Sequence, residues 1–521
     1  MSRDRPNVLL LMSDEHSYRF LGSRDPPTGE PVETPALDTL SRSGTAFDRA
    51  YCQMPLCAPS RQCLLTGREP RSCGAWDNWS VLGPGQPTLS GTLSDAGYET
   101  ALVGKMHLGG SRQFCGFDHR PYGDLTGGSA GGHQPDPPDP ERVNGLAEMR
   151  SRTAMAGVTD VPESLLQEYV VLRESVSFLR EHDHRRPDTP WFLCASFSRP
   201  HFPLTAPRRH FERYWPDGVT RPVVGFEGDT TDHPLTESAI EGFRTDEIDD
   251  EEMLRARAAY FASVSFLDEI VGEFVATLER DGFLENAIVV YASDHGELAG
   301  EHGLWWKHTW HEGSTRVPLV VQTPSQRRGE APAQDVETPV GLIDLYPTLC
   351  ALANVDAPDD LDGTDLSEAV ASGHEPDRGP VFCDNLVERW GPGTEFRMVR
   401  DGSYKYVGFR DAPELLFDLS ADPLETTNLA ASADDEHAAA LERLRSLVRD
   451  TMDFEAAERE RRADQRVREA YEWDVPGVAE STNAYRFPDG RVVDAGTPLY
   501  DPRVLLDDPA EEYDDWPDVD G

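Results

Sequence analysis

The chain has 521 residues, of which 38% are apolar, enough for a sizeable core and for one large domain with an appendage. Acidic side chains number 94 against 49 basic ones, which gives a formal net charge of −45. This charge excludes a nucleic-acid backbone or an anionic membrane as a partner, because both bind to basic surfaces. Recurring apolar runs exclude intrinsic disorder of the whole chain.

The basic residues are almost all arginine, since only positions 105, 307 and 405 are lysine. An acidic, lysine-poor chain is typical of a salt-adapted cytoplasm, where carboxylates keep the surface hydrated and dense salt screens their repulsion. The N-terminal apolar run 8–12 is too short for a signal peptide, and no run approaches the roughly 18 apolar residues of a membrane span. We therefore expect a halophilic, cytoplasmic protein without a membrane partner.

The eight cysteines match no zinc ribbon and no C-x-x-C motif, so we expect free thiols. They stand at positions 52, 57, 63, 73, 115, 194, 350 and 383.

The first part of the chain alternates strand and helix patterns. Residues 7–13 form a continuous apolar run, which predicts a strand buried on both faces of a parallel sheet. A helical period with a proline in the first turn predicts a helix over 34–43. A second helix start is predicted at 60–66, and a short strand at 100–104.

The alternation continues toward the middle of the chain. Strands are predicted at 191–197, 287–293 and 318–323, and the strongest helical period runs over 251–280. Because strands and helices alternate over residues 5–370, the fold class is predicted as α/β. We expect a large domain with a mainly parallel central sheet flanked by helices, plus a small C-terminal α+β subdomain.

Two stretches carry little core pattern. Residues 123–144 are rich in Gly, Pro and Asp and predict an exposed loop, and residues 225–252 predict an acidic surface excursion. The pattern changes from about residue 375, where short antiparallel strands are predicted over 396–407 and 415–419. A polar, charged helix is predicted over 430–468.

These patterns divide the chain into three parts. We predict an α/β domain over 1–374, a subdomain with short antiparallel strands and a helix over 375–470, and an acidic C-terminal extension over 471–521.

Clusters of acidic, histidine and lysine side chains directly follow three of the predicted strands. The sequence reads S-D-E-H at 13–16, K-M-H at 105–107 and S-D-H-G-E at 293–297. Ligands of open parallel sheets bind outside the carboxyl ends of the strands, and two carboxylates with an imidazole suit a hard divalent cation. One such Asp alone is more often a helix cap, so the prediction of a site rests on the recurrence at matching positions.

Residues 57–68 read C-A-P-S-R-Q-C-L-L-T-G-R. Taken alone, the segment predicts a turn leading into a helix, with Cys57 as a small buried residue. It also meets every fixed position of C-x-P-S-R-x-x-x-L-T-G-R, and so resembles the signature of the sulfatase family in the alkaline phosphatase superfamily. The resemblance covers about residues 5–430 and includes the T-P-A-L-D-T-L, G-K-M-H-L-G, R-P-H-F-P, S-D-H-G-E and R-V-P-L runs at 34–40, 104–109, 199–203, 293–297 and 316–319.

The resemblance implies hydrolysis of a sulfate monoester after a separate maturation enzyme oxidises Cys57 to formylglycine. Hydrated formylglycine is a gem-diol, of which one hydroxyl attacks sulfur and the other then loses its proton and expels sulfate. Asp14, Asp294 and His295, together with residue 57, would hold the divalent cation, which is Ca²⁺ by resemblance, with Mg²⁺ or Mn²⁺ as alternatives. The family often has a second Asp after the first, where this chain has Glu15.

Cations are expected around a transferring sulfuryl group, because negative charge on its oxygens must be stabilised. The resemblance assigns this role to Arg61, Lys105 and Lys307, and the orientation of the diol to His107. His201 resembles the histidine that binds the sulfate, and either His201 or Lys307 would protonate the leaving oxygen. Two of three lysines thus fall on motif positions, and the third is expected to be structural.

Other polar positions are left open between function and packing. An asparagine could contact sulfate or metal, histidines near Lys307 could contact substrate, and two arginines could bind an anionic substrate or stay solvated. These positions are Asn78, His302, His308, His311, Arg208 and Arg209.

The predicted substrate is a small sulfated molecule, with sulfated sugars, choline sulfate and aryl sulfates all open because substrate pockets are built from variable loops. Two alternatives stand beside this function. One is a phosphonate monoester or phosphodiester hydrolase of the same superfamily, and the other is a non-catalytic binding protein whose Cys57 is never oxidised.

Overall fold

The computed structural model describes residues 5–471, apart from 79, 84, 110–112, 122–123, 125–151, 160 and 227–231, and also 484–486 and 492–494. Nearly all of the loop predicted over 123–144 and of the extension predicted over 471–521 lies outside these described residues.

Seven strands form the central sheet, in the order β11-β2-β10-β8-β1-β6-β4. Strands β4, β6, β1 and β8 run parallel, β10 is antiparallel to both β8 and β2, and β11 is parallel to β2. The sheet is therefore mainly parallel, as predicted. The bounds are β1 Asn7–Asp14, β2 Thr45–Phe47, β4 Glu99–Gly104, β6 Trp191–Pro200, β8 Ala287–Ser293, β10 Leu319–Gln322 and β11 Gln334–Val336.

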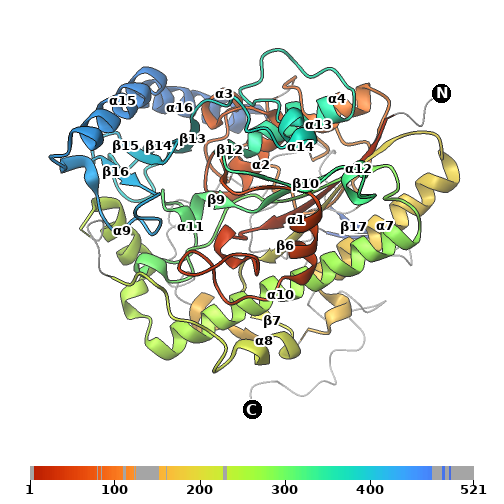
Figure 1. Ribbon diagram of the computed structural model, residues 1–521, viewed down its shortest axis with the longest axis horizontal. Coiled ribbons are helices and arrows are strands. Elements are labelled where there is room, and N and C mark those ends of the chain that lie inside the picture. Colours follow the sequence, from red (N-terminus) through yellow and green to blue (C-terminus); the bar gives the residue numbers. More distant parts are fainter. Residues whose placement is uncertain are drawn as a thin grey trace.

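Helices cover both faces of this sheet (Figure 1). Successive side chains of a strand point to opposite faces. Leu9 and Leu11 of β1 belong to the core formed with α7 and α10, whereas Val8 and Leu10 belong to the core formed with α2, α4 and α13. Both faces are buried, which explains the unbroken apolar run. The helices are α1 Pro35–Ser43, α2 Cys57–Thr66, α4 Leu89–Asp95, α7 Gln167–Arg185, α10 Asp250–Arg280 and α13 Leu345–Leu352.

Shorter elements join these layers. A three-stranded sheet contains β3 Ala50–Tyr51, β9 Arg316–Val317 and β12 Val340–Gly341. Two further pairs are β5 Gly157–Val158 with β7 Thr205–Ala206, and β17 Ala484–Arg486 with β18 Val492–Asp494. Further helices are α3 Pro70–Cys73, α8 Arg208–Tyr214, α11 Glu312–Thr315, α12 Pro324–Arg327 and α14 Ser367–Ser372. Among the described residues, no helix has the length and apolar character needed to cross a membrane.

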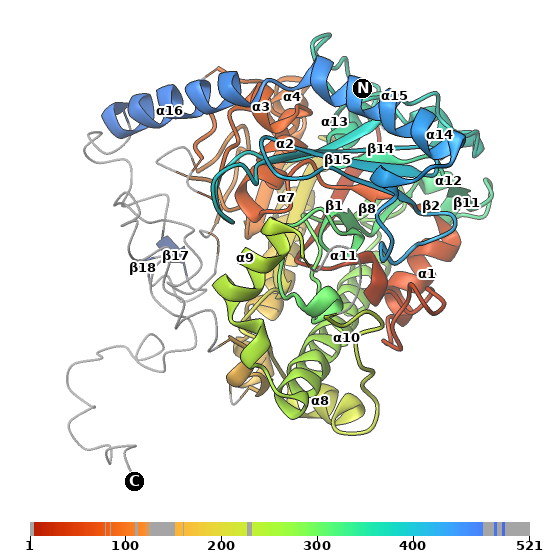
Figure 2. The same cartoon turned by 90° about the vertical axis from the view of Figure 1, so that its left-hand side faces the viewer.

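A four-stranded antiparallel sheet forms the small C-terminal subdomain, as predicted, in the order β13-β14-β15-β16. Helix α15 covers it with Leu444 and Val448, which join one apolar cluster with Val399 and Leu416 of the strands. Figure 2 shows α15 and α16 end to end along this sheet. The bounds are β13 Val381–Asn385, β14 Phe396–Asp401, β15 Tyr404–Phe409, β16 Leu415–Asp418, α15 Asp435–Thr451 and α16 Phe454–Tyr471.

The single helix predicted over 430–468 is wrong, because the segment folds as α15 and α16. Met452 leaves the helical conformation and is buried, while the Asp453 carboxylate accepts a hydrogen bond from the backbone N–H of Ala456. An apolar residue drawn into the core followed by an N-cap ends one helix and starts the next.

The surface excursion predicted over 225–252 is also wrong in part. Residues Pro234–Phe243 form helix α9, whose Leu235, Ala239 and Phe243 are buried in the main core. These three residues stand four apart, which places them on one face of a helix. The acidic composition around them concealed this short apolar stripe.

Lys405 holds the subdomain to the large domain. Its buried ammonium lies 3.1 Å from Glu312 of α11 and 2.7 Å from Glu425. The hydroxyl of Tyr51 in β3 donates a hydrogen bond to Glu312 and accepts one from Arg400 of β14. The network therefore crosses the boundary between the large domain and the subdomain, here called the seam, twice. The third lysine is therefore structural, as expected. The predicted division at residues 374 and 470 stays a prediction.

Replacing Lys405 by methionine leaves two buried carboxylates facing each other without their shared cation. We expect Lys405→Met to lower the free energy of unfolding by about 3–5 kcal/mol, measured by denaturant titration. Arg328→Met is the control, since Arg328 forms an exposed pair with Glu330 and its loss leaves stability nearly unchanged. Equal effects in the two variants would contradict a stabilising role for the seam network.

Candidate active site

The candidate site lies where β1 and β8 end beside the start of α2. These strands are parallel neighbours, with Ser13 opposite Ser293, so the residues that follow, Asp14 and Asp294, emerge at one edge of the sheet. Cys57 is the first residue of α2. The strand-end pattern therefore brings together the residues predicted to hold a metal.

Four buried side chains converge at this edge: Asp14, Cys57, Asp294 and His295. The Cys57 Sγ lies 3.1 Å from Nε2 of His295 and 3.7 Å from Oδ1 of Asp14. Nε2 of His295 is 3.7 Å from one oxygen of each aspartate. The ligand atoms lie within 4.8 Å of one another, close enough to share one cation.

The orientation of His295 fits a metal ligand. Its Nδ1 lies 3.0 Å from the carbonyl oxygen of Gly296, which makes Nδ1–H the donor and leaves the Nε2 lone pair toward the carboxylates. Burial disfavours a charged imidazole, yet Asp294 and Cys57 raise the pKa of His295 to about 10. The anions around the ring therefore favour a positive charge at this position, which a divalent cation would supply. The donor set therefore fits the cation implied by the sequence resemblance.

Arg61 lies behind the two aspartates. Its Nε donates to Asp294 at 2.7 Å, one terminal nitrogen to Asp14 at 3.2 Å, and the other to the Lys105 carbonyl and the Ser196 hydroxyl at 2.6 and 2.9 Å. The guanidinium is fully buried and positions both carboxylates. Its predicted role in stabilising charge on a sulfuryl group stays a prediction.

Two lysines face the Cys57 sulfur from different elements. Nζ of Lys105, after β4, lies 3.9 Å from Sγ and also pairs with Asp14, and Nζ of Lys307 lies 3.6 Å from Sγ. Burial raises the pKa of the thiol, but the two ammonium groups outweigh it and hold that pKa well below its usual value. An anion at position 57 is therefore stabilised by two cations.

Glu15 lies beside the four-residue group, and the ligand atoms of Asp14, Glu15 and His201 are also within 4.8 Å of one another. The backbone of Glu15 adopts a left-handed conformation with φ +67°, and its carboxylate lies 3.1 Å from Nζ of Lys307 and 3.4 Å from Nε2 of His201. Burial raises the pKa of Glu15 to about 7 despite these cations. The longer side chain that replaces the family's second aspartate thus positions Lys307 and His201.

His107 is held beside the thiol by a residue that the sequence patterns did not single out. The carboxylate of Asp124 accepts the backbone N–H groups of Met106 and His107 at 2.9 Å each. This fixes a turn in which His107 has φ +53° and lies near enough to Cys57 to lower the pKa of the thiol. No motif marks Asp124, so only the fold could reveal it.

The six positions left open between function and packing all make contacts within the protein, and their role stays open. Asn78 accepts the backbone N–H of Ala58 at the start of α2, which supports residue 57 through the backbone. The rings of His302 and His311 lie 4.1 Å apart at a tilt, and Arg209 bonds to both Glu163 and Glu269. The remaining two positions are Arg208, which pairs with Glu212 on the surface, and His308, which is buried beside Trp390.

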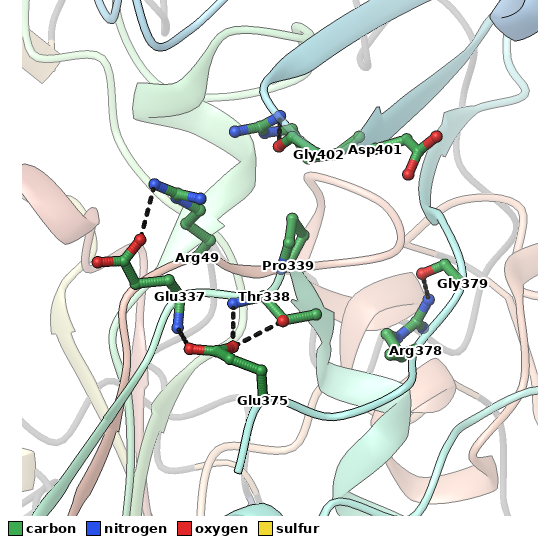
Figure 3. Close-up of a pocket in the computed structure, with 10 residues that line it drawn as sticks. Arg49, Glu337, Thr338, Pro339, Glu375, Arg378, Gly379, Asp401 and Gly402 are labelled. Carbon is green, nitrogen blue, oxygen red and sulfur yellow. Dashed lines mark hydrogen bonds and ion pairs between the residues drawn. The ribbon is translucent and has the colours of Figure 1, made fainter. Parts of the chain in front are cut away.

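A separate pocket of about 340 Å³ lies at the seam between the domains (Figure 3). Its charged groups are bound to one another or to the backbone. Arg49 pairs with Glu337, Glu375 accepts two backbone N–H groups, and Arg378 donates to the carbonyl of Gly379. This pocket contains none of the predicted site residues.

Comparisons with known proteins show the family of this chain. The sulfatase family model matches residues 6–355, and the model of the N-sulphoglucosamine sulphohydrolase C-terminal region matches residues 300–452. A choline-sulfatase of Rhizobium meliloti is 32% identical over 89% of this chain and 90% of its own length. An arylsulfatase of Clostridium perfringens is 28% identical over 85% and 94%. The phosphonate monoester hydrolase of Agrobacterium radiobacter superposes with a TM-score of 0.68 at 25% identity, covering 86% of this chain and 96% of that one.

A mainly parallel sheet whose strand ends gather two aspartates, a histidine and a cysteine defines a hydrolase of the alkaline phosphatase-like superfamily. The family model covers more than half of the chain, so the protein belongs to the sulfatase family. It is a sulfuric ester hydrolase, and the predicted family and fold class are confirmed.

Cation binding at the four-residue group is expected to stabilise the fold. After dialysis against a chelator, added Ca²⁺, Mg²⁺ or Mn²⁺ at about 100 times its Kd should raise the free energy of unfolding by about 2.7 kcal/mol. His295→Gln should abolish most of this gain, whereas His374→Gln, at an exposed histidine, should retain it. Thermal melts measure the effect, and identical wild-type melts with and without all three ions would contradict a metal site.

Proposed function

We propose that this protein hydrolyses a sulfate monoester at residue 57, after conversion of Cys57 to formylglycine, with a divalent cation held by Asp14, Asp294 and His295. The observation that carries the proposal is the placement of Cys57. It opens α2 within an intact C-x-P-S-R run, 3.1 Å from His295 and between two lysines. The choline-sulfatase and arylsulfatase relatives support a sulfate ester as the substrate.

The residues around position 57 suit the charge of this reaction. Lys105 and Lys307 stabilise negative charge on the sulfuryl oxygens, and Arg61 keeps the aspartates in place. Lys307 and His201 stand on the side of Glu15, which orients both toward the leaving oxygen. Either group can donate the proton that the departing alcohol needs.

Two groups complete the site. A divalent cation on Asp14, Asp294 and His295 polarises the bound sulfate, and Ca²⁺ is proposed from family resemblance, with Mg²⁺ and Mn²⁺ as alternatives. Hydrated formylglycine at residue 57 supplies a nucleophile that can later release the sulfate by returning to the aldehyde. A maturation enzyme that reads the C-x-P-S-R run is therefore a proposed partner.

The similarity to a phosphonate monoester hydrolase favours a second candidate activity, on phosphonate monoesters or phosphodiesters. The same cation and lysines would stabilise charge on a phosphoryl group. The kcat/KM ratio between an aryl sulfate and an aryl phosphonate monoester separates the two, and a ratio below one would reverse the order of the candidates.

Peptide mass spectrometry across residue 57 tests the nucleophile in protein purified from a host with a maturation enzyme. We expect a residue in which aldehyde oxygen, or its hydrate, replaces sulfur. Cys57→Ala should lower kcat on an aryl sulfate by about 10⁴-fold or more, while Cys63→Ala in the same helix keeps the activity. A fully unmodified thiol with no turnover would favour the non-catalytic alternative.

Lys307→Met tests the second lysine. Removing this ammonium should lower kcat/KM on 4-nitrophenyl sulfate by about 10²–10³-fold. Esters of less acidic phenols should lose more if Lys307 is also the proton donor. Arg209→Met removes a positive charge far from residue 57 and is the control. Equal losses in both variants would rule out a role for Lys307 at the reacting group.

A further inference from the structure

Aromatic rings beside the candidate site carry a second group of cations. The guanidinium of Arg152 lies 3.4 Å from the ring centre of Phe202 and 5.4 Å from that of Trp306. Phe202 directly follows His201, and Nζ of Lys307 lies 5.6 Å from the same ring. Arg152 and the sulfur-facing Lys307 therefore both approach the same aromatic ring.

The C-terminal subdomain adds another arginine at this position. Arg389 lies over the rings of Trp390 and Phe243, and Nε1 of Trp390 donates to the His308 carbonyl at 3.1 Å. That bond fixes the Arg389 segment against the residue that follows Lys307. The two domains thus meet beside the candidate site.

Arg389 is a half-buried cation with no ion pair to a carboxylate in the described part of the chain. Its Nε is inaccessible to solvent and has no hydrogen-bond partner in the described part of the chain. Burial and the neighbouring Arg152 lower the pKa of Arg389 to about 10, and no described carboxylate offsets them. A half-buried guanidinium beside a second one is unfavourable unless an anion pairs with it.

We propose that Arg152 and Arg389 bind a second anionic group, a carboxylate or a further sulfate, on the alcohol whose sulfate ester is hydrolysed at residue 57. Planar guanidiniums match both anions with paired hydrogen bonds. The inference rests on the proposed function, since that function places the scissile sulfate beside Lys307. The single guanidinium of Arg152 already lies near both Phe202 and Trp306, which disfavours a quaternary ammonium such as choline on these rings.

Substrate pairs of similar phenol acidity test the inference on the wild-type protein. We expect kcat/KM for 4-carboxyphenyl sulfate and for 1,4-phenylene disulfate to exceed that for neutral 4-carbamoylphenyl sulfate by about 10- to 100-fold. The carboxylate and disulfate substrates distinguish the two anions. Choline sulfate should be the poorest of the four, and a higher kcat/KM for choline sulfate or for the neutral ester would overturn the inference.

Substitutions of the two arginines test whether they cause the preference for anionic esters. Arg389→Gln and Arg152→Gln should each lower the preference for the anionic over the neutral ester by about 10-fold or more, and Arg389→Lys should restore part of it. Arg328→Gln, at an exposed ion pair, should keep the wild-type preference. An unchanged preference for the anionic ester in both Arg389→Gln and Arg152→Gln would overturn the inference.

Binding of the sulfate-free phenols separates this inference from the proposed function. Calorimetry should show tighter binding of 4-hydroxybenzoate than of 4-hydroxybenzamide, with the difference lost in Arg389→Gln. If no ester is turned over but this difference is present, the proposed function fails and the anion subsite stands. Equal affinities in the wild type would overturn the subsite.

Discussion

The buried fork of Arg61 between Asp14 and Asp294 is the interaction on which the site depends. Two carboxylates at adjacent strand ends repel each other, and removing them from water is unfavourable. A guanidinium with a fixed geometry neutralises one oxygen of each and leaves the other oxygens toward Cys57 and His295. Because Arg61 also donates to Ser196 and to the Lys105 carbonyl, the same side chain ties together the ends of β4, β6, β1 and β8.

The small subdomain contributes to the same centre. Lys405 and Arg400 fasten its sheet to Glu312 and Tyr51, and Trp390 bonds to the backbone beside Lys307. The residues around position 57 come from the large domain, whereas the proposed anion subsite would take one of its two arginines, Arg389, from the subdomain. Such a division allows the nucleophile and its cations to stay constant while the recognised alcohol changes.

Most of the fold could be predicted because its strands are short, buried and bounded by turns. The strand at 7–13, with its continuous apolar run, and the helix at 251–280, with its strong helical period, are examples. Prediction failed where composition and packing disagree. The acidic context of α9 hid three core residues, and the charged run at 430–468 gave no sign that Met452 is drawn into the core between two helices.

The sequence by itself determined the family, the central sheet and the identity of the residues around position 57, because the signature and the strand-end runs are local patterns. Only the tertiary structure decided what these residues do to one another. Arg61 supports the carboxylates, Glu15 orients Lys307, and Asp124 holds the turn of His107, since side-chain direction depends on neighbours distant in the chain. The approach of Arg389 to Arg152, 237 positions apart, likewise follows from the packing of the two domains.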